Sequence, residues 1–469
     1  MFNKAIYCNR RNQLKSLLGN GIILLIGNEQ SSMSYKDNWY PFRQDSTFLY
    51  FTGLDTPDLA AIIDIDNDTE IIFGDETGVD DIIWNGRQPS LKEMADHSGC
   101  NSTRPYSELE ASIKKFQSSK QPIHFLPPYR AEHTQLLSHL LSIPLNSVAG
   151  SVSINLIKAI VSLRSIKSPD EVEEIKKGVA TSELMQLKGM QISREGLTES
   201  YVAGLVEAVA IGGGGKLSFP TILTTHGEIL HNHYSNKVLP AGKLVLLDCG
   251  AETAMHYAGD LTRTFPVDAS FTTLQKEVYN IVLTAEQAAA AALQPGILFR
   301  DIHLLAAEKL IEGLKELGVM QGDVKEAVAA GAHTLFFQCG LGHMMGLDVH
   351  DMENLGEQYV GYTPELKKGT AFGLKSLRLG RALEPGFVLT VEPGLYFIPE
   401  LMDIWAAEKK LTQFINYNKL DVFRDFGGIR IEDDYLVTTE GSELLSTSLP
   451  RTAEAIELIR REALAGVQG

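Results

Sequence analysis

Residues Lys243–Val267 read KLVLLDCGAETAMHYAGDLTRTFPV, and this stretch decides how the rest of the chain is interpreted. A run of branched apolar residues ends at one carboxylate, Asp248, and a second, Asp260, follows an Ala-Gly pair. A short apolar run bounded by glycine and proline predicts a buried strand, so we expect the two aspartates on adjacent strands of a hairpin. Buried carboxylates are costly unless a cation neutralises them. They therefore share a metal ion, pair with Arg263, or cap backbone amides.

Three later segments each place a ligand-type side chain beside glycine or proline, or on an apolar strand. They are QCGLGHMMGLDVHD with His343, LTVEPGLYF with Glu392, and GGIRIEDDYLV with Glu432. Together with the two aspartates, they make a set that is rich in oxygen and holds a single nitrogen ligand. Such a set suits two carboxylate-bridged divalent ions of the harder kind, Mn, Fe or Co, better than a thiolate-type zinc site.

The order and wording of these segments resemble the pita-bread metallopeptidases, and within them the proline-specific branch of aminopeptidase P and prolidase. The match runs from about Pro169 to Thr452 through DxG, GDLTRTFPV, GHxxGLDVHD, LTVEPGLYF and GIRIEDD. The resemblance implies an α+β fold: a pita-bread (creatinase/aminopeptidase-like) catalytic domain over residues 166–469, built from two helix–strand halves. A smaller α/β domain is expected over residues 1–165. Its phrase WYPFRQDSTFLYFTG resembles the N-terminal domain of aminopeptidase P, although such aromatic density is also typical of core packing.

The resemblance also implies a role for each ligand-type residue. Two divalent ions would be held by Asp248, Asp260, His343, Glu392 and Glu432, with Asp260 and Glu432 bridging. Manganese is the expected ion, with cobalt, iron and zinc as alternatives. Two cations lower the pKa of a shared water to about 7, so hydroxide can attack an amide carbon at neutral pH. Glu392 is expected to carry the proton to the leaving nitrogen.

Two histidines and an arginine complete the expected catalytic set. His233, in the phrase HYxxN, and His350, in LDVHD, are expected to stabilise the tetrahedral intermediate and the leaving proline nitrogen. The neighbouring His231 does not carry the resemblance. Arg430 lies two residues before Glu432 and so shares its strand face, where it would hold a bridging carboxylate or another partner of the ligands.

The chain departs from the family pattern at two places. Cys339 stands where the family usually has a histidine, four residues before the metal ligand, so substrate preference at that wall is open. The interval between the two aspartates is one residue longer than usual, and a bulge or longer turn near Thr253–His256 would absorb it.

Two further segments bear on the substrate. The phrase SLR at residues 376–378 resembles a prolidase phrase in which the arginine, here Arg378, binds the carboxylate of a dipeptide. Residues 398–425 form an insertion rich in charged and aromatic residues, which is either a helical arm or dimer contact, or an exposed helix pair.

These features predict a metal-dependent Xaa-Pro aminopeptidase that acts on short peptides with proline at the second position. Prolidase is the alternative, and the two differ in whether Arg378 faces a substrate carboxylate. A pita-bread protein that lost its metals and became a binding module is a third possibility, and the intact ligand set argues against it.

Composition limits the partners and the compartment. The net charge of −17 argues against nucleic acid or an anionic membrane as partner. Four scattered cysteines without a CxxC pair fit a reducing compartment, and the sequence predicts a cytoplasmic protein. The resemblance implies a homodimer or homotetramer. Trp84 occupies a place where the family carries a tryptophan that reaches a neighbouring subunit's active site, and the alternative is a partly buried loop residue.

Overall fold

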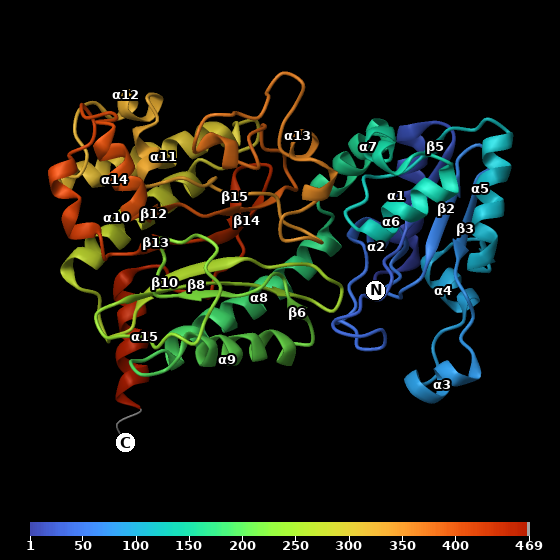
Figure 1. Cartoon of the computed structure of the whole chain (residues 1–469), viewed down its shortest axis with the longest axis horizontal. Coiled ribbons are helices and arrows are strands. Elements are labelled where there is room, and N and C mark those ends of the chain that lie inside the picture. Colours follow the sequence, from blue (N-terminus) through green and yellow to red (C-terminus); the bar gives the residue numbers. More distant parts are fainter. Residues whose placement is uncertain (467–469) are drawn as a thin grey trace. The chain divides into compact units, whose positions relative to one another are not determined.

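The computed structural model describes residues 1–466, which divide into two compact units (Figure 1). One unit contains residues 1–164 together with residues 352–359, and the other contains residues 165–351 and the chain from Val360 onward. Among the described residues, no helix combines the length and the apolar character that a membrane span requires.

The N-terminal unit is built on a five-stranded mixed sheet in the order β4-β3-β2-β1-β5. Its strands are β1 (Ile22–Ile26), β2 (Ala60–Asp64), β3 (Thr69–Phe73), β4 (Ser102–Arg104) and β5 (Ile123–His124). Its helices are α1 (Lys4–Leu18), α2 (Ser46–Thr52), α3 (Val79–Asn85), α4 (Leu91–Ser98), α5 (Leu109–Ser118), α6 (Ala131–Leu141) and α7 (Ile154–Ser165). The sequence IILLI of β1 is almost wholly buried, as a central strand covered on both faces requires.

The aromatic phrase at residues 39–53 has two different environments. Its second half forms α2, which is entirely buried and is capped by the Asp45 side chain. Trp39 and Tyr40, in the first half, are exposed. Trp84 lies on α3, a helix without buried residues, and its side chain is 83% exposed, so the alternative of a partly buried loop residue is wrong.

The second unit, residues 165–351 and the chain from Val360 onward, is the one that the resemblance implies to be catalytic, and it is called the catalytic unit below. It repeats one arrangement twice, as the resemblance implies. The first half pairs helices α8 (Pro169–Ile192) and α9 (Glu199–Gly212) with the antiparallel sheet β10-β8-β7 (Leu261–Pro266, Leu244–Cys249, Ile222–Thr224). The second half pairs α10 (Thr273–Ala291) and α11 (Phe299–Glu316) with β11-β14-β15 (Val388–Val391, Asp433–Val437, Ser442–Leu444). The remaining helices and strands of this unit are β6 (Lys216–Leu217), β9 (Ala251–Glu252), β12 (Gly394–Tyr396), β13 (Gly428–Arg430), α12 (Val324–Ala329), α14 (Pro399–Ala407) and α15 (Ala453–Ala465). Helix α13 (Glu357–Val360) lies mostly in the segment at residues 352–359 that belongs to the N-terminal unit.

Local sequence accounts for two features of the catalytic unit, the start of α8 and the predicted turn between the two aspartates. Helix α8 begins with Ser168 as N-cap, Pro169 in the first turn, and a capping box closed by Glu171. The long interval between the two aspartates is absorbed by a turn in which the Thr253 amide donates to the Tyr257 carbonyl. In that turn His256 adopts a left-handed φ of 66°, a conformation that the ordered contacts around it must stabilise.

The insertion at residues 398–425 is not an exposed helix pair. It contains one α-helix, α14, followed by two short 3-10 turns, and it buries the side chains of Met402, Trp405 and Phe423. Backbone bonds from Gln321 to Phe414 and from Asn416 to Val319 attach it to the chain that follows α11.

Candidate metal centre and substrate pocket

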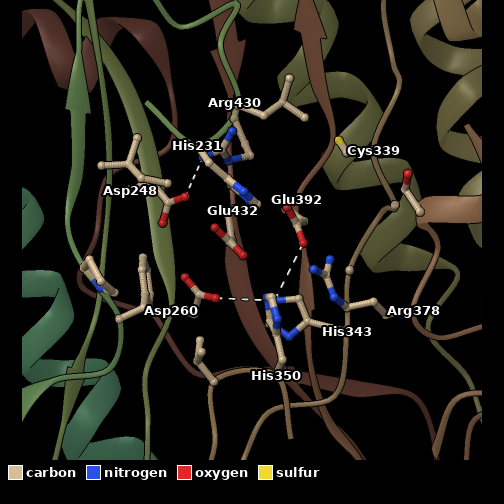
Figure 2. Close-up of a pocket in the computed structure, with 18 of the residues that line it drawn as sticks. His231, Asp248, Asp260, Cys339, His343, His350, Arg378, Glu392, Arg430 and Glu432 are labelled. Atoms are coloured by element: carbon tan, nitrogen blue, oxygen red, sulfur yellow. Dashed lines mark hydrogen bonds and ion pairs between the residues drawn. The ribbon is translucent and has the colours of Figure 1, made fainter. Parts of the chain in front are cut away.

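The five ligand-type residues converge on one cavity of about 250 Å³ in the catalytic unit (Figure 2). Asp248 lies on β8 and Asp260 directly precedes β10, so the first half of the unit supplies two carboxylates. His343, Glu392 and Glu432 come from the second half, where Glu392 follows β11 and Glu432 lies between β13 and β14. The two halves meet at an isolated bridge in which the Glu432 amide donates to the Thr262 carbonyl.

The hairpin register brings the two aspartates together. In the antiparallel pair of β8 and β10, Thr262 lies opposite Asp248 and Leu261 opposite Cys249. Gln186 of α8 donates through Nε2 to the backbone carbonyls of Leu247 and Leu261, and so ties both strands beside their ligands. No motif pointed to Gln186.

Three of the ligands form the centre of the cluster. One ligand atom each of Asp260, His343 and Glu432 lies within 4.8 Å of the others. His343 Nε2 is 3.4 Å from Asp260 Oδ2 and 3.7 Å from Glu392 Oε1. The other ring nitrogen, Nδ1, is 3.1 Å from the Met344 carbonyl, an arrangement that keeps Nε2 turned toward the carboxylates.

Arg430 pairs with Asp248, which is not one of the two carboxylates expected to bridge. Its Nη2 contacts Asp248 Oδ2, while Nη1 donates to the Tyr396 hydroxyl at 3.1 Å. Arg263 instead forms a fully buried ion pair with Asp433 at 2.7 Å, so the alternative in which Arg263 neutralises the two aspartates is wrong.

Burial outweighs the effect of the positively charged side chains that lie near the carboxyl groups of Asp260 and Glu392. Burial is the largest cause that raises the pKa of Asp260 to about 8 and that of Glu392 to about 7. Burial and the neighbouring carboxylates raise the pKa of Glu432 well above its ordinary range. Among the described residues, the Oδ1 atom of Asp248 is buried without a hydrogen-bond partner. Three buried carboxylates, the partly buried Glu392 and one imidazole therefore fit a divalent cation that would complete their charge balance.

The wall of the cavity brings together most of the other predicted site residues. His233, His350, Arg378 and Cys339 all line it, and the ring of His350 lies edge-on to that of His343 at 4.3 Å between centroids. Burial raises the pKa of the Cys339 thiol to about 12, which keeps it neutral. Trp84 belongs to the N-terminal unit and is not among the lining residues.

His231 also lines the cavity, although the sequence pattern passed over it (Figure 2). Burial and the nearby Arg430 lower the pKa of His231, so it is uncharged at neutral pH. The sequence did contain a signal for His231. It lies two residues from His233, and in an extended segment side chains two residues apart lie on the same face.

Both units match known family models. Residues 173–439 match metallopeptidase family M24, and residues 7–124 match the aminopeptidase P N-terminal domain. Among curated relatives, the Xaa-Pro dipeptidase of Homo sapiens is 31% identical over 465 residues, covering 97% of this chain and 92% of the relative. The Xaa-Pro aminopeptidase of Escherichia coli is 30% identical over 434 residues, covering 90% of each chain.

Solved structures give the same result. Aminopeptidase P from E. coli with the inhibitor Pro-Leu superposes with a TM-score of 0.81 at 27% identity, covering 99% of both chains. Aminopeptidase PepP of Pseudomonas aeruginosa gives a TM-score of 0.82 at 25% identity and the same coverage. The chain thus belongs to metallopeptidase family M24, as a metallopeptidase with an aminopeptidase P N-terminal domain ahead of its pita-bread catalytic domain.

Proposed function

We propose that this protein is a metal-dependent Xaa-Pro aminopeptidase, which removes the first residue from short peptides whose second residue is proline. The observation that carries the proposal is the convergence of five ligand-type side chains on one cavity whose wall also holds two histidines. The aminopeptidase P N-terminal domain and the full-length similarity to aminopeptidase P structures support it.

The proposed cofactor is a pair of divalent ions, with manganese first and cobalt, iron or zinc as alternatives. Asp248, Asp260, His343, Glu392 and Glu432 would hold these ions, and ligand atoms of Asp260, His343 and Glu432 lie within 4.8 Å of one another. When bound, such ions supply Lewis acidity and lower the pKa of water to about 7, which makes a nucleophile available at neutral pH. The oxygen-rich donor set supports hard ions over thiophilic ones.

The protein's own side chains then handle protons and developing charge. Glu392 is placed to accept a proton from the nucleophile and to return it to the proline nitrogen, which lacks a hydrogen of its own. His233 and His350 donate hydrogen bonds where negative charge develops on the scissile carbonyl. The apolar wall contributed by Phe219, Pro220 and other side chains offers a surface for the proline ring.

A dipeptidase activity is the second candidate, and Arg378 is the observation that favours it. Arg378 lines the same cavity as the proposed ligands, where a guanidinium can hold a substrate carboxylate through two hydrogen bonds. Only a dipeptide presents its carboxylate directly after the proline. The similarity to the human Xaa-Pro dipeptidase supports this candidate as well.

A paired assay on metal-free and manganese-reconstituted protein separates the two candidates. Manganese-dependent cleavage of Ala-Pro-Ala with little turnover of Gly-Pro supports the aminopeptidase. Turnover of Gly-Pro with refusal of Ala-Pro-Ala supports the dipeptidase, and Ala-Ala-Ala serves as the control that tests the need for proline. Absence of metal in active protein would overturn both.

We also propose a cytoplasmic homodimer or homotetramer with domains at residues 1–165 and 166–469. The exposed Trp84 and its exposed neighbour Ile83 on α3 support a subunit contact. Light scattering on the wild type and on Trp84→Ala tests this, because a smaller assembly is expected for the variant, and an unchanged monomeric mass for both would refute it.

A further inference from the structure

The loop from His343 to Asp351 carries both a proposed metal ligand and a proposed substrate-contacting residue, yet it contains neither helix nor strand. Its shape depends on individual bonds. The Asp351 amide donates to the Met344 carbonyl at 2.9 Å, and the Gly346 amide donates to the Asp348 carbonyl at 3.0 Å. The start of the loop is also tied to β11, because the Met345 amide donates to the Val388 carbonyl and the Thr390 amide donates to the His343 carbonyl. The far end of the loop, at Asp351, is the part that a side-chain anchor can hold.

Lys167 provides that anchor from a distant part of the sequence. Its Nζ lies 2.9 Å from Asp351 Oδ2, and both side chains are 1% exposed. A side chain added at Gly346 would meet Asp351 Oδ2 at 2.7 Å and Lys167 Cε at 3.0 Å, so the loop backbone lies directly against the ion pair. The Lys167 amide in turn donates to the Gly386 carbonyl, which fixes the lysine to the chain just before β11.

The ion pair is connected to the metal centre through one carbonyl group. The Met344 carbonyl accepts from the Asp351 amide and also lies 3.1 Å from His343 Nδ1. Besides the bridge between Met344 and Leu389, the Asp351 amide is therefore a contact that sets the position of the acceptor that orients the His343 ring. His350 directly precedes Asp351, so its ring, 4.3 Å from that of His343, depends on the same anchor.

We propose that Lys167 is a positioning residue for the metal centre: its buried ion pair with Asp351 holds the loop so that His343 and His350 face the carboxylates. The proposal rests on the proposed metal function, but it is independent of which peptide is cleaved. Partners that orient a ligand from outside the coordination shell change metal affinity or activity by about 10- to 100-fold when removed. A buried pair that loses one partner also leaves an uncompensated charge, so stability must be measured separately.

The test measures Co²⁺ binding in protein kept well below its melting temperature. The protein is titrated with Co²⁺, and the visible absorption of the bound ion is recorded. Lys167→Met is expected to weaken Co²⁺ binding by about 10- to 100-fold and to alter the absorption spectrum. Lys177→Met is the matched control, because it removes an α8 lysine whose side chain is 66% exposed, and it should leave both unchanged.

A double variant, Lys167→Met with Asp351→Asn, also removes the negative charge of residue 351 and keeps an acceptor for the Asp348 amide. It is expected to melt close to the wild type but to keep the weakened Co²⁺ binding, which separates positioning from stability. Wild-type affinity and spectrum in the folded double variant would overturn the proposal, even if Lys167→Met alone does not fold. Wild-type protein that binds Co²⁺ but cleaves no Xaa-Pro peptide would refute the proposed function and leave this comparison intact.

Discussion

Metal binding should release protons at mildly acidic pH, because the pKa values of the proposed carboxyl ligands are raised when no metal is present. With a pKa of about 8 for Asp260 and about 7 for Glu392, both carboxyl groups hold a proton at pH 6. A metal binds only the ionised forms, so these two groups release about two protons per protein at pH 6. Each released proton makes the affinity rise by about tenfold per pH unit, and the rise should level off above about pH 8.

Calorimetric titration with Mn²⁺ in buffers of different ionisation enthalpy measures the released protons directly. We expect about two or more protons at pH 6, since Glu432 is also raised in pKa, and close to none from Asp260 and Glu392 at pH 9. Glu392→Gln should lower the count at pH 6 by about one. Binding that releases no proton at pH 6, or the same number at both pH values, would refute the assignment of these buried carboxylates as ligands.

Three substitutions test other parts of the site. Arg378→Met should lower cleavage of Gly-Pro by at least about tenfold while sparing Ala-Pro-Ala, if the arginine holds a dipeptide carboxylate; equal loss on both substrates contradicts that role. Gly342→Ala should abolish Mn²⁺ binding in a titration, because its new methyl group would lie 2.0 Å from a backbone carbonyl of β11, whereas Gly204→Ala in open space on α9 should not. Arg263→Met should lower the free energy of unfolding by about 3–5 kcal/mol in urea, against at most about 1 kcal/mol for the exposed Arg424→Met; similar losses would refute the burial argument.

The sequence predicted those parts of the site whose chemistry is local. The strand Leu244–Cys249, which carries Asp248, depends on a few consecutive residues, so pattern and structure agree. The ligand-type residues could be found because each lies in a short distinctive phrase, and the fold brings all of them to one cavity.

Contacts between distant segments could not be predicted in the same way. Nothing in the local pattern of Gln186 or Lys167 shows that one reaches two ligand strands and the other an aspartate 184 residues away. The charges and aromatic residues of the insertion left open a helical arm, a dimer contact or an exposed helix pair, and they did not indicate that Trp405 is buried. Long-range contacts and the burial of a side chain depend on tertiary packing, which the hydrophobic periodicity of a single segment does not reveal.

The short segment at residues 352–359 limits how this enzyme can be recombined with its relatives. It follows Asp351 directly, yet it belongs to the compact body formed by residues 1–164, and its Met352 and Leu355 are buried. A chimaera that exchanges only residues 1–164 would confront this segment with a foreign surface, immediately after the residue that Lys167 holds. A graft of another N-terminal domain therefore has to transfer residues 1–164 and residues 352–359 together. The catalytic unit cannot be exchanged as one continuous stretch of sequence.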